Sequence, residues 1–319
     1  MKSILDIAKR VIQIEGETLQ DLANRLDGNF ISAVELIHSS SGRCVITGIG
    51  KSAIIGKKIA ATLSSTGTPA FFMHAADAIH GDLGMIDKSD ILICLSKSGT
   101  TEEIKVLIPI LKGFGNKIIG ITASEQSDLA MNADIFIHTP VSMEADPNNL
   151  APTASSTAMM VLGDALAMSL QVKNGFTKDQ FAMVHPGGSL GKRLYLRVSD
   201  LCVKNEKPTS KPDDDLTTVI LEMTTKRLGA TAVIDESDNL IGVITDGDLR
   251  RMLSNSDNIS GMKASDIMTS NPRSIEVNEL AVKALETIRT FSITQLIVVD
   301  SGKYIGIIHI HDLIREGII

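Results

Sequence analysis

The sequence contains no tryptophan, and aromatic residues make up only 3% of its 319 positions. Basic residues are also outnumbered, since the net charge is -7 and the sequence pI is about 5.5. Proteins that bind nucleic acids usually combine a basic face with aromatic side chains on which bases stack. The composition therefore argues against nucleic acid as a partner.

Long hydrophobic runs and cysteines are scarce as well. No apolar run approaches the roughly 20 residues of a membrane-spanning helix, and Met1–Arg10 lacks the apolar core of a secretory signal. The three cysteines, Cys44, Cys94 and Cys202, lie far apart. This number and spacing favour neither a zinc site nor a disulfide framework. We expect a cytoplasmic protein that does not contact a membrane.

What the sequence does contain is enough apolar material for the cores of two domains, with 43% hydrophobic residues and a mean hydropathy of +0.15. Apolar residues recur at helical steps over residues 3–26, and a second helix is predicted at about 30–39. Both precede the first predicted strand. We therefore consider that this pair packs on a neighbouring subunit instead of the sheet.

From residue 43 the pattern changes to alternating strands and helices, which predicts a five-stranded parallel sheet flanked by helices on both faces. A long apolar helix follows at 152–173. The predicted strands are 43–48, 69–73, 90–95, 117–122 and 134–138, and the helices between them are 52–65, 101–113 and 126–132.

Two loops that follow predicted strands carry hydroxyls and glycines. One is Ser96–Thr101, with the sequence SKSGTT, and the other is Gly48–Ser52, with the sequence GIGKS. A loop of this kind aims N–H groups and the positive end of a helix dipole at one point, which suits a phosphate group. Ordinary helix capping by Ser and Thr is the alternative. The spacing of Gly48 and Gly50 is too short for a Walker A motif, which disfavours a triphosphate.

Histidines and carboxylates cluster between the second and third predicted strands, at His74, Asp77, His80 and Asp82. A metal site is one interpretation of this cluster, and a single solvated helix face that carries His74, Asp77 and His80 is the other. We favour the second, because a structural zinc site needs a closed tetrahedral set that usually includes cysteine. Further along, His185 precedes Pro-Gly-Gly in a tight turn.

An internal repeat begins at residue 198. Ile241–Leu249 matches Ile305–Leu313, and Ser199–Leu201 matches Ser265–Ile267. Each repeat is predicted to contain a short leader, a helix, two apolar strands and a final helix, and such units bury one another. The charged, proline-containing stretch Lys204–Asp215 is predicted to belong to this module rather than to a linker.

Several motifs together carry a resemblance to a known family. Residues 1–197 resemble a sugar isomerase (SIS) domain, and residues 198–319 resemble a tandem CBS pair with repeats at about 198–256 and 264–319. Together they resemble the arabinose-5-phosphate isomerases of bacterial Kdo synthesis. The motifs are Gly48–Ser52, Ser64–Pro69, His80–Met85, Ser96–Gly99, Leu150–Thr153 and His185–Gly188.

The resemblance implies interconversion of D-ribulose 5-phosphate and D-arabinose 5-phosphate through an enediol, as the first step of Kdo formation, with no cofactor and no required metal. By resemblance, the phosphate-binding residues are Ser52, Ser96, Ser98 and Thr101, and the catalytic residues are Lys51, His80, Glu103, Glu144 and His185. Two of these residues have a non-catalytic alternative. Glu103 could interact with the helix dipole, and Glu144 could be a solvated acid in a loop.

Two other functions are compatible with the same loops. A non-catalytic SIS sensor of a phosphosugar would need only the hydroxyls and glycines, and an isomerase of a different phosphosugar would keep the same loops. The resemblance to SIS domains implies an obligate dimer. We therefore expect at least a homodimer, and favour a homotetramer in which His80 reaches a neighbour's site. We also expect adventitious zinc to inhibit by binding His80 and His185.

The CBS pair has its own candidate ligand. In such pairs a hydroxyl residue followed three positions later by Asp often holds a nucleotide ribose, which implicates Thr245 with Asp248 and, in the altered second repeat, Asp312. The expected ligand is a nucleotide or the nucleotide-activated sugar CMP-Kdo. Residues 201–319 hold 13 basic and 18 acidic residues, a net charge of -5, which disfavours a polyphosphate and keeps a purely structural role open.

Overall fold

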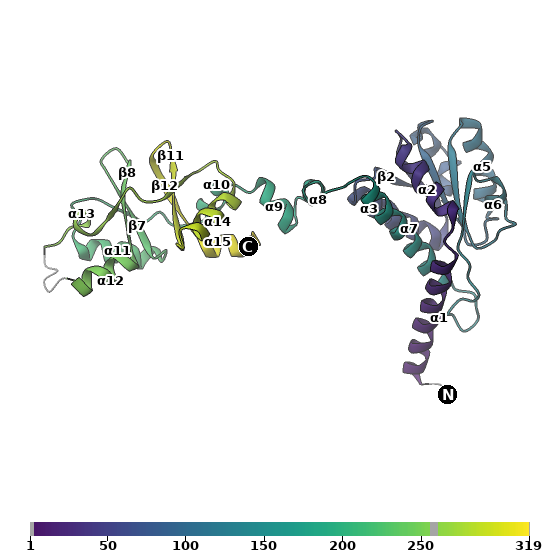
Figure 1. Cartoon of the computed structure of the whole chain (residues 1–319), viewed down its shortest axis with the longest axis horizontal. Helices are drawn as coiled ribbons and strands as arrows, with labels where there is room; N and C mark the ends of the chain where they lie inside the picture. The colour runs from purple at the N-terminus through teal and green to yellow at the C-terminus, as the bar shows by residue number, and fades with distance from the viewer. Residues whose placement is uncertain (1–2, 256–260, 319) are drawn as a thin grey trace. The chain divides into compact units, whose positions relative to one another are not determined.

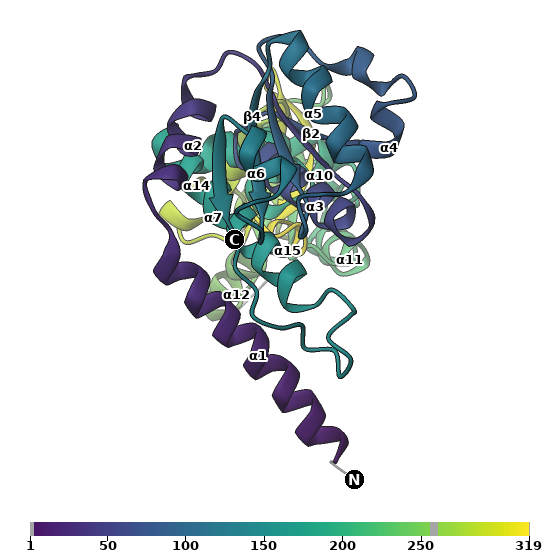
Figure 2. The ribbon, with the colours of Figure 1, turned by 90° about the vertical axis from the view of Figure 1, so that its right-hand side faces the viewer.

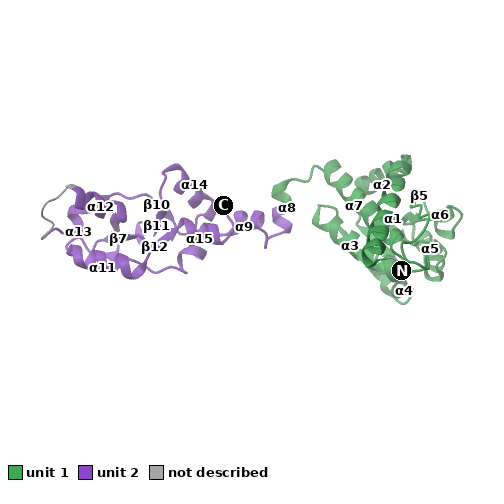
Figure 3. Cartoon of the chain, turned by 90° about the horizontal axis from the view of Figure 1, so that it is seen from below, with its two compact units in different colours: residues 1–181 green, residues 182–319 purple. Residues whose placement is uncertain are grey.

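The computed structural model describes residues 3–255 and 261–318. The chain divides into two compact units, residues 1–181 and residues 182–319, which Figure 3 colours separately. The first unit contains the predicted parallel sheet, and the second contains the internal repeat (Figure 1).

In the first unit, helices and strands alternate as the sequence predicts. Every predicted strand and helix of this unit is present, with ends that shift by only a few residues. The elements are α1 (Ile4–Arg25), α2 (Gly28–Ser39), β1 (Cys44–Gly48), α3 (Gly50–Ser65), β2 (Ala70–His74), α4 (Ala75–Ala78), the 3₁₀ helix η1 (Asp82–Met85), β3 (Ile91–Leu95), α5 (Glu102–Phe114), β4 (Lys117–Thr122), α6 (Asp128–Asn132), β5 (Ile135–His138) and α7 (Ala154–Lys173).

The five strands form one parallel sheet in the order β2-β1-β3-β4-β5, which confirms the predicted fold class. Alternate strand residues face opposite sides. Ile46 and Ile93 belong to the core under α2, α3 and α7, whereas Val45 and Leu92 belong to the core under α4, α5 and α6. Both faces are therefore buried, which explains why the strands are apolar runs without visible alternation.

The N-terminal helices correct one expectation. Ala33, Val34 and Ile37 of α2 are buried in the core with α7 and the sheet, so α2 packs within its own chain. The first turns of α1 are different, because the side chains of Ile4 and Ile12 are 88% and 72% exposed. Figure 2 shows this end of α1 leaving the body of the unit.

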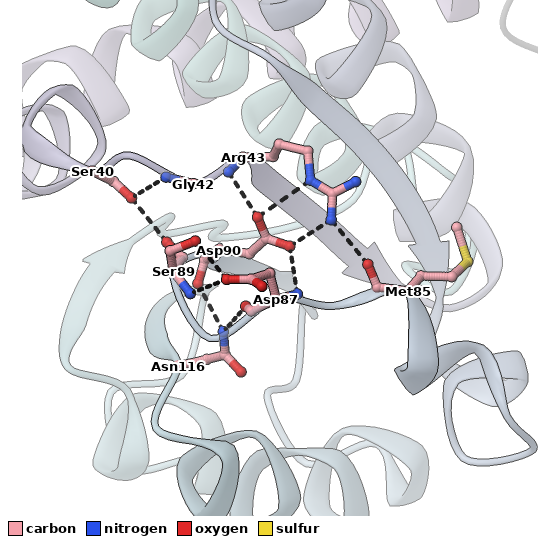
Figure 4. A network of polar contacts seen from close by, with 8 residues as sticks. All are labelled: Ser40, Gly42, Arg43, Met85, Asp87, Ser89, Asp90 and Asn116. Carbon is pink, nitrogen blue, oxygen red and sulfur yellow. Dashed lines mark hydrogen bonds and ion pairs between the residues drawn. The ribbon is translucent and has the colours of Figure 1, made fainter.

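A polar network joins the amino ends of the strands. The buried Asp90 carboxylate accepts hydrogen bonds from the backbone N–H and the guanidinium of Arg43, at 2.8 Å each (Figure 4). Arg43 also donates to the carbonyl of Met85, and the Asn116 amide donates to the carbonyls of Asp87 and Asp90. The network fixes where β1 and β3 begin, at the edge of the sheet opposite the loops that end these strands.

The second unit contains two βαββα repeats. Its elements are α8 (Lys178–Val184), which spans the unit boundary, α9 (Ser189–Tyr195), α10 (Val198–Cys202), β6 (Thr209–Ser210), α11 (Leu216–Lys226), β7 (Ala230–Ile234), β8 (Leu240–Thr245), α12 (Asp246–Asn255), α13 (Ala264–Ile267), β9 (Thr269–Ser270), β10 (Ser274–Glu276), α14 (Ala281–Thr290), β11 (Gln295–Asp300), β12 (Lys303–His309) and α15 (Ile310–Arg315).

The two repeats are packed against each other, as predicted. The strand β9, near the start of the second repeat, pairs with β8 of the first, and the buried hydroxyl of Tyr304 donates to the carbonyl of Pro208. Strand β6 lies inside the charged stretch 204–215 and pairs with β7, so that stretch belongs to the module. None of the helices within residues 3–255 and 261–318 combines the length and apolar composition that a membrane crossing requires.

Candidate functional site

A pocket of about 270 Å³ opens at the carboxyl ends of β1 and β3. The chain leaves β1 toward β2 on one side, and β3 lies on the other side of β1, so this is the point where the strand order reverses. Ligands of open parallel sheets bind at such points. Five of the residues selected from the sequence line the pocket, namely Lys51, Ser52, Ser96, Ser98 and Thr101.

The loop after β3 is held by its own hydroxyls. Ser96 is buried, and its Oγ lies 2.9 Å from Oγ1 of Thr101 and accepts the Gly99 N–H at 3.0 Å. Gly99 has a φ of +66°, and a Cβ at this position would lie 2.1 Å from Oγ of Ser127. The turn therefore requires glycine for both its backbone conformation and its close packing.

Three helices begin at this pocket. Lys51 and Ser52 lie in the first turn of α3, Thr101 is the N-cap of α5, and Ser155 lies in the first turn of α7. Within the described part of the chain, Ile49 and Thr101, the N-cap residues of α3 and α5, make no side-chain capping bond. These two helix starts direct unpaired N–H groups and positive dipole ends toward an anion.

The third helix start, that of α7, is capped by Glu144. Its side chain has no exposed surface, which corrects the interpretation of Glu144 as a solvated loop acid. One carboxylate oxygen accepts the backbone N–H groups of Thr153 and Ser155 and the Thr153 hydroxyl, at 2.8, 3.2 and 3.1 Å. The other accepts the Ser155 hydroxyl at 2.5 Å and pairs with Nζ of Lys97 at 2.6 Å.

These contacts determine the charge of Glu144. Burial alone raises the pKa of its carboxyl, but the hydrogen bonds from Lys97, Ser155 and Thr153 outweigh burial and lower the pKa to about 2. Glu144 is therefore an ionised, fully bonded carboxylate near neutral pH.

The remaining catalytic candidates lie outside the lining of this pocket. Glu103 is half-buried in the first turn of α5, and His80 is exposed just after α4. His185 lies in the second unit, so the geometry described for the first unit does not include it. The single helix face proposed for His74, Asp77 and His80 is wrong, because α4 covers only Ala75–Ala78 and His74 ends β2.

No group of three or more His, Cys, Asp or Glu side chains within residues 3–255 and 261–318 is arranged to hold a metal ion. Of the histidines and carboxylates that cluster in the sequence, His74 and Asp77 form an ion-pair contact, with Nδ1 of the imidazole 3.9 Å from the carboxylate.

A second pocket, of about 430 Å³, lies within the repeat module. Thr245 and Asp248, the nucleotide-binding candidates of the first repeat, both line it. The largely buried Asp248 accepts hydrogen bonds from the Thr245 N–H and hydroxyl and pairs with Arg251 at 2.6 Å. Arg250, Arg251 and Arg273 also line the pocket, as does Asp246, so its lining holds three basic and two acidic side chains.

Asp312, the third candidate of the module, has a different position. It does not belong to the lining of that pocket, and one of its carboxylate oxygens accepts the His309 N–H at 2.8 Å and the Asn205 amide at 2.7 Å. Asp312 thus caps the start of α15.

Seven residues that line the first pocket were not selected from the sequence, namely Ile49, Leu95, Lys97, Pro152, Ser155, Ser156 and Met159. Lys97 lies inside one of the family motifs, and both serines lie in a segment whose hydroxyls suggested ordinary capping. The hydroxyl-rich start of α7 could have pointed to the two serines. The sequence alone did not show that α7 begins beside the starts of α3 and α5.

Comparisons with known proteins identify both domains and similar whole chains. The SIS domain model matches residues 36–169, and the CBS domain model matches residues 198–255 and 264–318. A protein of Francisella tularensis named "Arabinose 5-phosphate isomerase KdsD" is 47% identical over 99% of this chain and 98% of its own length. One of the same name from Pseudomonas aeruginosa is 44% identical over 98% and 96%.

A solved structure is also similar. A protein of Escherichia coli CFT073, in complex with arabinose 5-phosphate, is 40% identical with a TM-score of 0.57. The match covers 58% of this chain and all of that one.

Proposed function

The chain belongs to the family of arabinose 5-phosphate isomerases, and from this premise we propose that the pocket at the ends of β1 and β3 binds the phosphate of a pentose phosphate. The reaction is the interconversion of D-arabinose 5-phosphate and D-ribulose 5-phosphate. We further propose that it supplies the first step of Kdo formation, for lipopolysaccharide or capsule.

One observation carries the proposal for the phosphate. The helices α3 and α5 begin at one pocket without side-chain caps in the described chain, and Lys51, Ser52, Ser96, Ser98 and Thr101 surround it. Backbone N–H groups, hydroxyl donors and a lysine together match the oxygens of a phosphate dianion. The volume of about 270 Å³ suits a small sugar phosphate rather than a nucleotide.

The chemistry requires a proton to move between carbons 1 and 2 of the sugar. One group acts as the base, and a donor stabilises the oxyanion of the enediol. We propose Glu103 as the base, because it lies in the first turn of the helix whose start binds the phosphate. Lys51 serves the phosphate or the oxyanion, and His80 and His185 serve ring opening and proton transfer at the sugar oxygens.

The direct test measures ribulose 5-phosphate formation by the full chain from arabinose 5-phosphate, beside a panel of other pentose and hexose phosphates. The proposal predicts turnover that is greatest with arabinose 5-phosphate. Binding of a phosphosugar without turnover would identify a sensor, and preferred turnover of another sugar would identify a different isomerase.

For the module of repeats, we propose an anionic nucleotide as the ligand, either a simple nucleotide or a nucleotide-activated sugar such as CMP-Kdo. Support comes from Arg250, Arg251 and Arg273, which line the pocket of about 430 Å³ together with Thr245 and Asp248. Guanidinium groups bind phosphate oxygens in pairs of hydrogen bonds.

Calorimetry on the full chain with adenine and cytidine nucleotides tests this ligand. We expect heat of binding with at least one of them, and a weaker signal after Asp248→Ala, which releases Thr245 and Arg251. The absence of heat with all of them would leave the module a structural role.

We also propose a homotetramer, or at least a homodimer, in the cytoplasm. The exposed apolar side chains at the start of α1, Ile4, Leu5 and Ile12, are the support for self-association, because apolar surface of this kind is usually covered by a partner. The three cysteines are free thiols, which fits a reducing compartment. A fully active monomer in light scattering at the assay concentration would refute the assembly.

A further inference from the structure

The pairing of Lys97 with Glu144 was not expected from the sequence. Lys97 belongs to the loop after β3, and Glu144 lies 47 residues later, before α7. Nζ of Lys97 lies 2.6 Å from the carboxylate, and the lysine side chain is 44% exposed while that of Glu144 has no exposed surface. The lysine therefore has one side against a buried anion and the other facing outward.

Lys97 also lines the pocket at the carboxyl ends of β1 and β3. An ammonium group has three N–H donors, and the ion pair with Glu144 uses one of them. The other donors can face a ligand in the pocket. A lysine on an exposed loop would normally sample many rotamers, but the short contact with Glu144 restricts this one.

Glu144 is in turn immobilised by α7. Its carboxylate accepts two backbone N–H groups and two hydroxyls of Thr153 and Ser155 besides Lys97. Five donors on two oxygens leave the carboxylate little capacity to accept a proton from substrate, and its pKa of about 2 agrees with this. A general base for sugar chemistry near neutral pH needs a higher pKa.

We propose that Lys97 is a further binding residue for the anionic substrate and that Glu144 is a positioning residue which holds Lys97 at the pocket, instead of a proton-transfer group. The proposal rests on the proposed function for the identity of the substrate. The chemistry that Lys97 recognises is an anionic phosphate or sugar oxygen.

The variants Lys97→Met and Glu144→Gln test the two roles. Lys97→Met removes the ammonium group and keeps an unbranched side chain only one atom shorter. We expect KM for arabinose 5-phosphate to rise by about tenfold or more, as when a charge-assisted hydrogen bond is lost, with a much smaller change in kcat. Lys97→Arg should restore most of the affinity. Glu144→Gln should also raise KM and leave the shape of the kcat pH profile unchanged.

A matched control is Lys117→Met. Lys117 pairs with Asp134 at 2.7 Å, and it lies at the amino end of β4, at the opposite edge of the same sheet. It forms a similar ion pair away from the pocket, so its loss should leave KM unchanged. The double variant of Lys97 and Glu144 should be little worse than Lys97→Met, because the carboxylate acts through the lysine.

Inorganic phosphate, measured by calorimetry on the full chain, separates this inference from the isomerase assignment. Weaker phosphate binding by Lys97→Met than by Lys117→Met supports the inference even if no isomerase activity is found. Unchanged phosphate binding and unchanged KM in a folded, active Lys97→Met protein would overturn the role of Lys97. A folded Glu144→Gln protein with normal KM, strongly reduced kcat and an altered pH profile would overturn the role of Glu144.

Discussion

Replacing Gly99 by alanine is the substitution to which the candidate pocket should be most sensitive. Gly99 adopts a φ of +66° in the loop after β3, and an added Cβ would lie 2.1 Å from Oγ and 2.5 Å from Cβ of Ser127. Ser127 is 1% exposed and caps α6 by accepting the Ala130 N–H, so it cannot simply turn away. Either the cap of α6 or the loop must move.

Two costs combine in this variant. A left-handed conformation costs an L residue roughly 1–2 kcal/mol. Forcing a methyl group into a packed site costs roughly 1–3 kcal/mol. The free energy of unfolding should therefore fall by about 2–5 kcal/mol, which lowers the unfolding temperature by about 4–20 °C for a unit of this size. The displaced loop carries Ser96 and Ser98, so KM for arabinose 5-phosphate should rise as well.

Gly113→Ala is the control for this prediction, because it makes the same change near the end of α5. No heavy atom among the described residues lies within 4 Å of a Cβ at Gly113, and alanine favours the helix by about 0.5–1 kcal/mol. Differential scanning calorimetry and steady-state kinetics on both variants provide the comparison. If Gly99→Ala matches Gly113→Ala in stability and in KM, the geometry of this loop is not what forms the pocket.

Three further predictions follow from the polar groups. Asp90→Asn removes the buried charge from the ion pair with Arg43, whose side chain is 46% exposed, and should lower the free energy of unfolding by about 1–3 kcal/mol in urea titrations. No measurable loss would make the network incidental. Despite burial, hydrogen bonds lower the folded-state pKa of the Glu144 carboxyl to about 2, so its contribution to stability is complete above pH 4.5 and decreases as the pH falls toward about 2. Burial is likewise outweighed at Asp90, where hydrogen bonds from Arg43 lower the pKa of the carboxyl, so Asp90 adds to the same loss in acid, and a flat unfolding midpoint across this range would contradict both. Glu103→Gln should reduce kcat by about 10²–10⁴ while arabinose 5-phosphate still binds, and a variant that keeps more than about a tenth of the turnover would show that Glu103 is not the base.

Most of the first unit could be predicted from the sequence, because parallel strands buried on both faces and amphipathic helices leave local patterns. The phosphate loops after β1 and β3 were predictable for the same reason, since hydroxyls and glycines follow each strand directly. Their proximity followed from the rule that consecutive parallel strands end at the same edge of a sheet.

What the sequence could not provide was the partner of a buried charge. A solvated loop acid was an alternative for Glu144 because the residue lies in the loop between β5 and α7. Its five donors come from Lys97, Thr153 and Ser155. Those contacts depend on where α7 begins relative to β3, which no local pattern encodes. The net charge of the repeat module likewise gave no information on where its charges lie, and three arginines and two aspartates line one pocket of this acidic domain.

Isomerisation of arabinose 5-phosphate by the full chain in D₂O, followed by NMR, tests the central claim most directly. The enediol route through the pocket predicts that ribulose 5-phosphate forms and that at least part of it carries one deuterium at carbon 1, taken from solvent when the intermediate is reprotonated. Ketose that forms without any deuterium would contradict an enediol that exchanges with solvent. The absence of ketose from a folded protein that binds the sugar phosphate would contradict the isomerase itself.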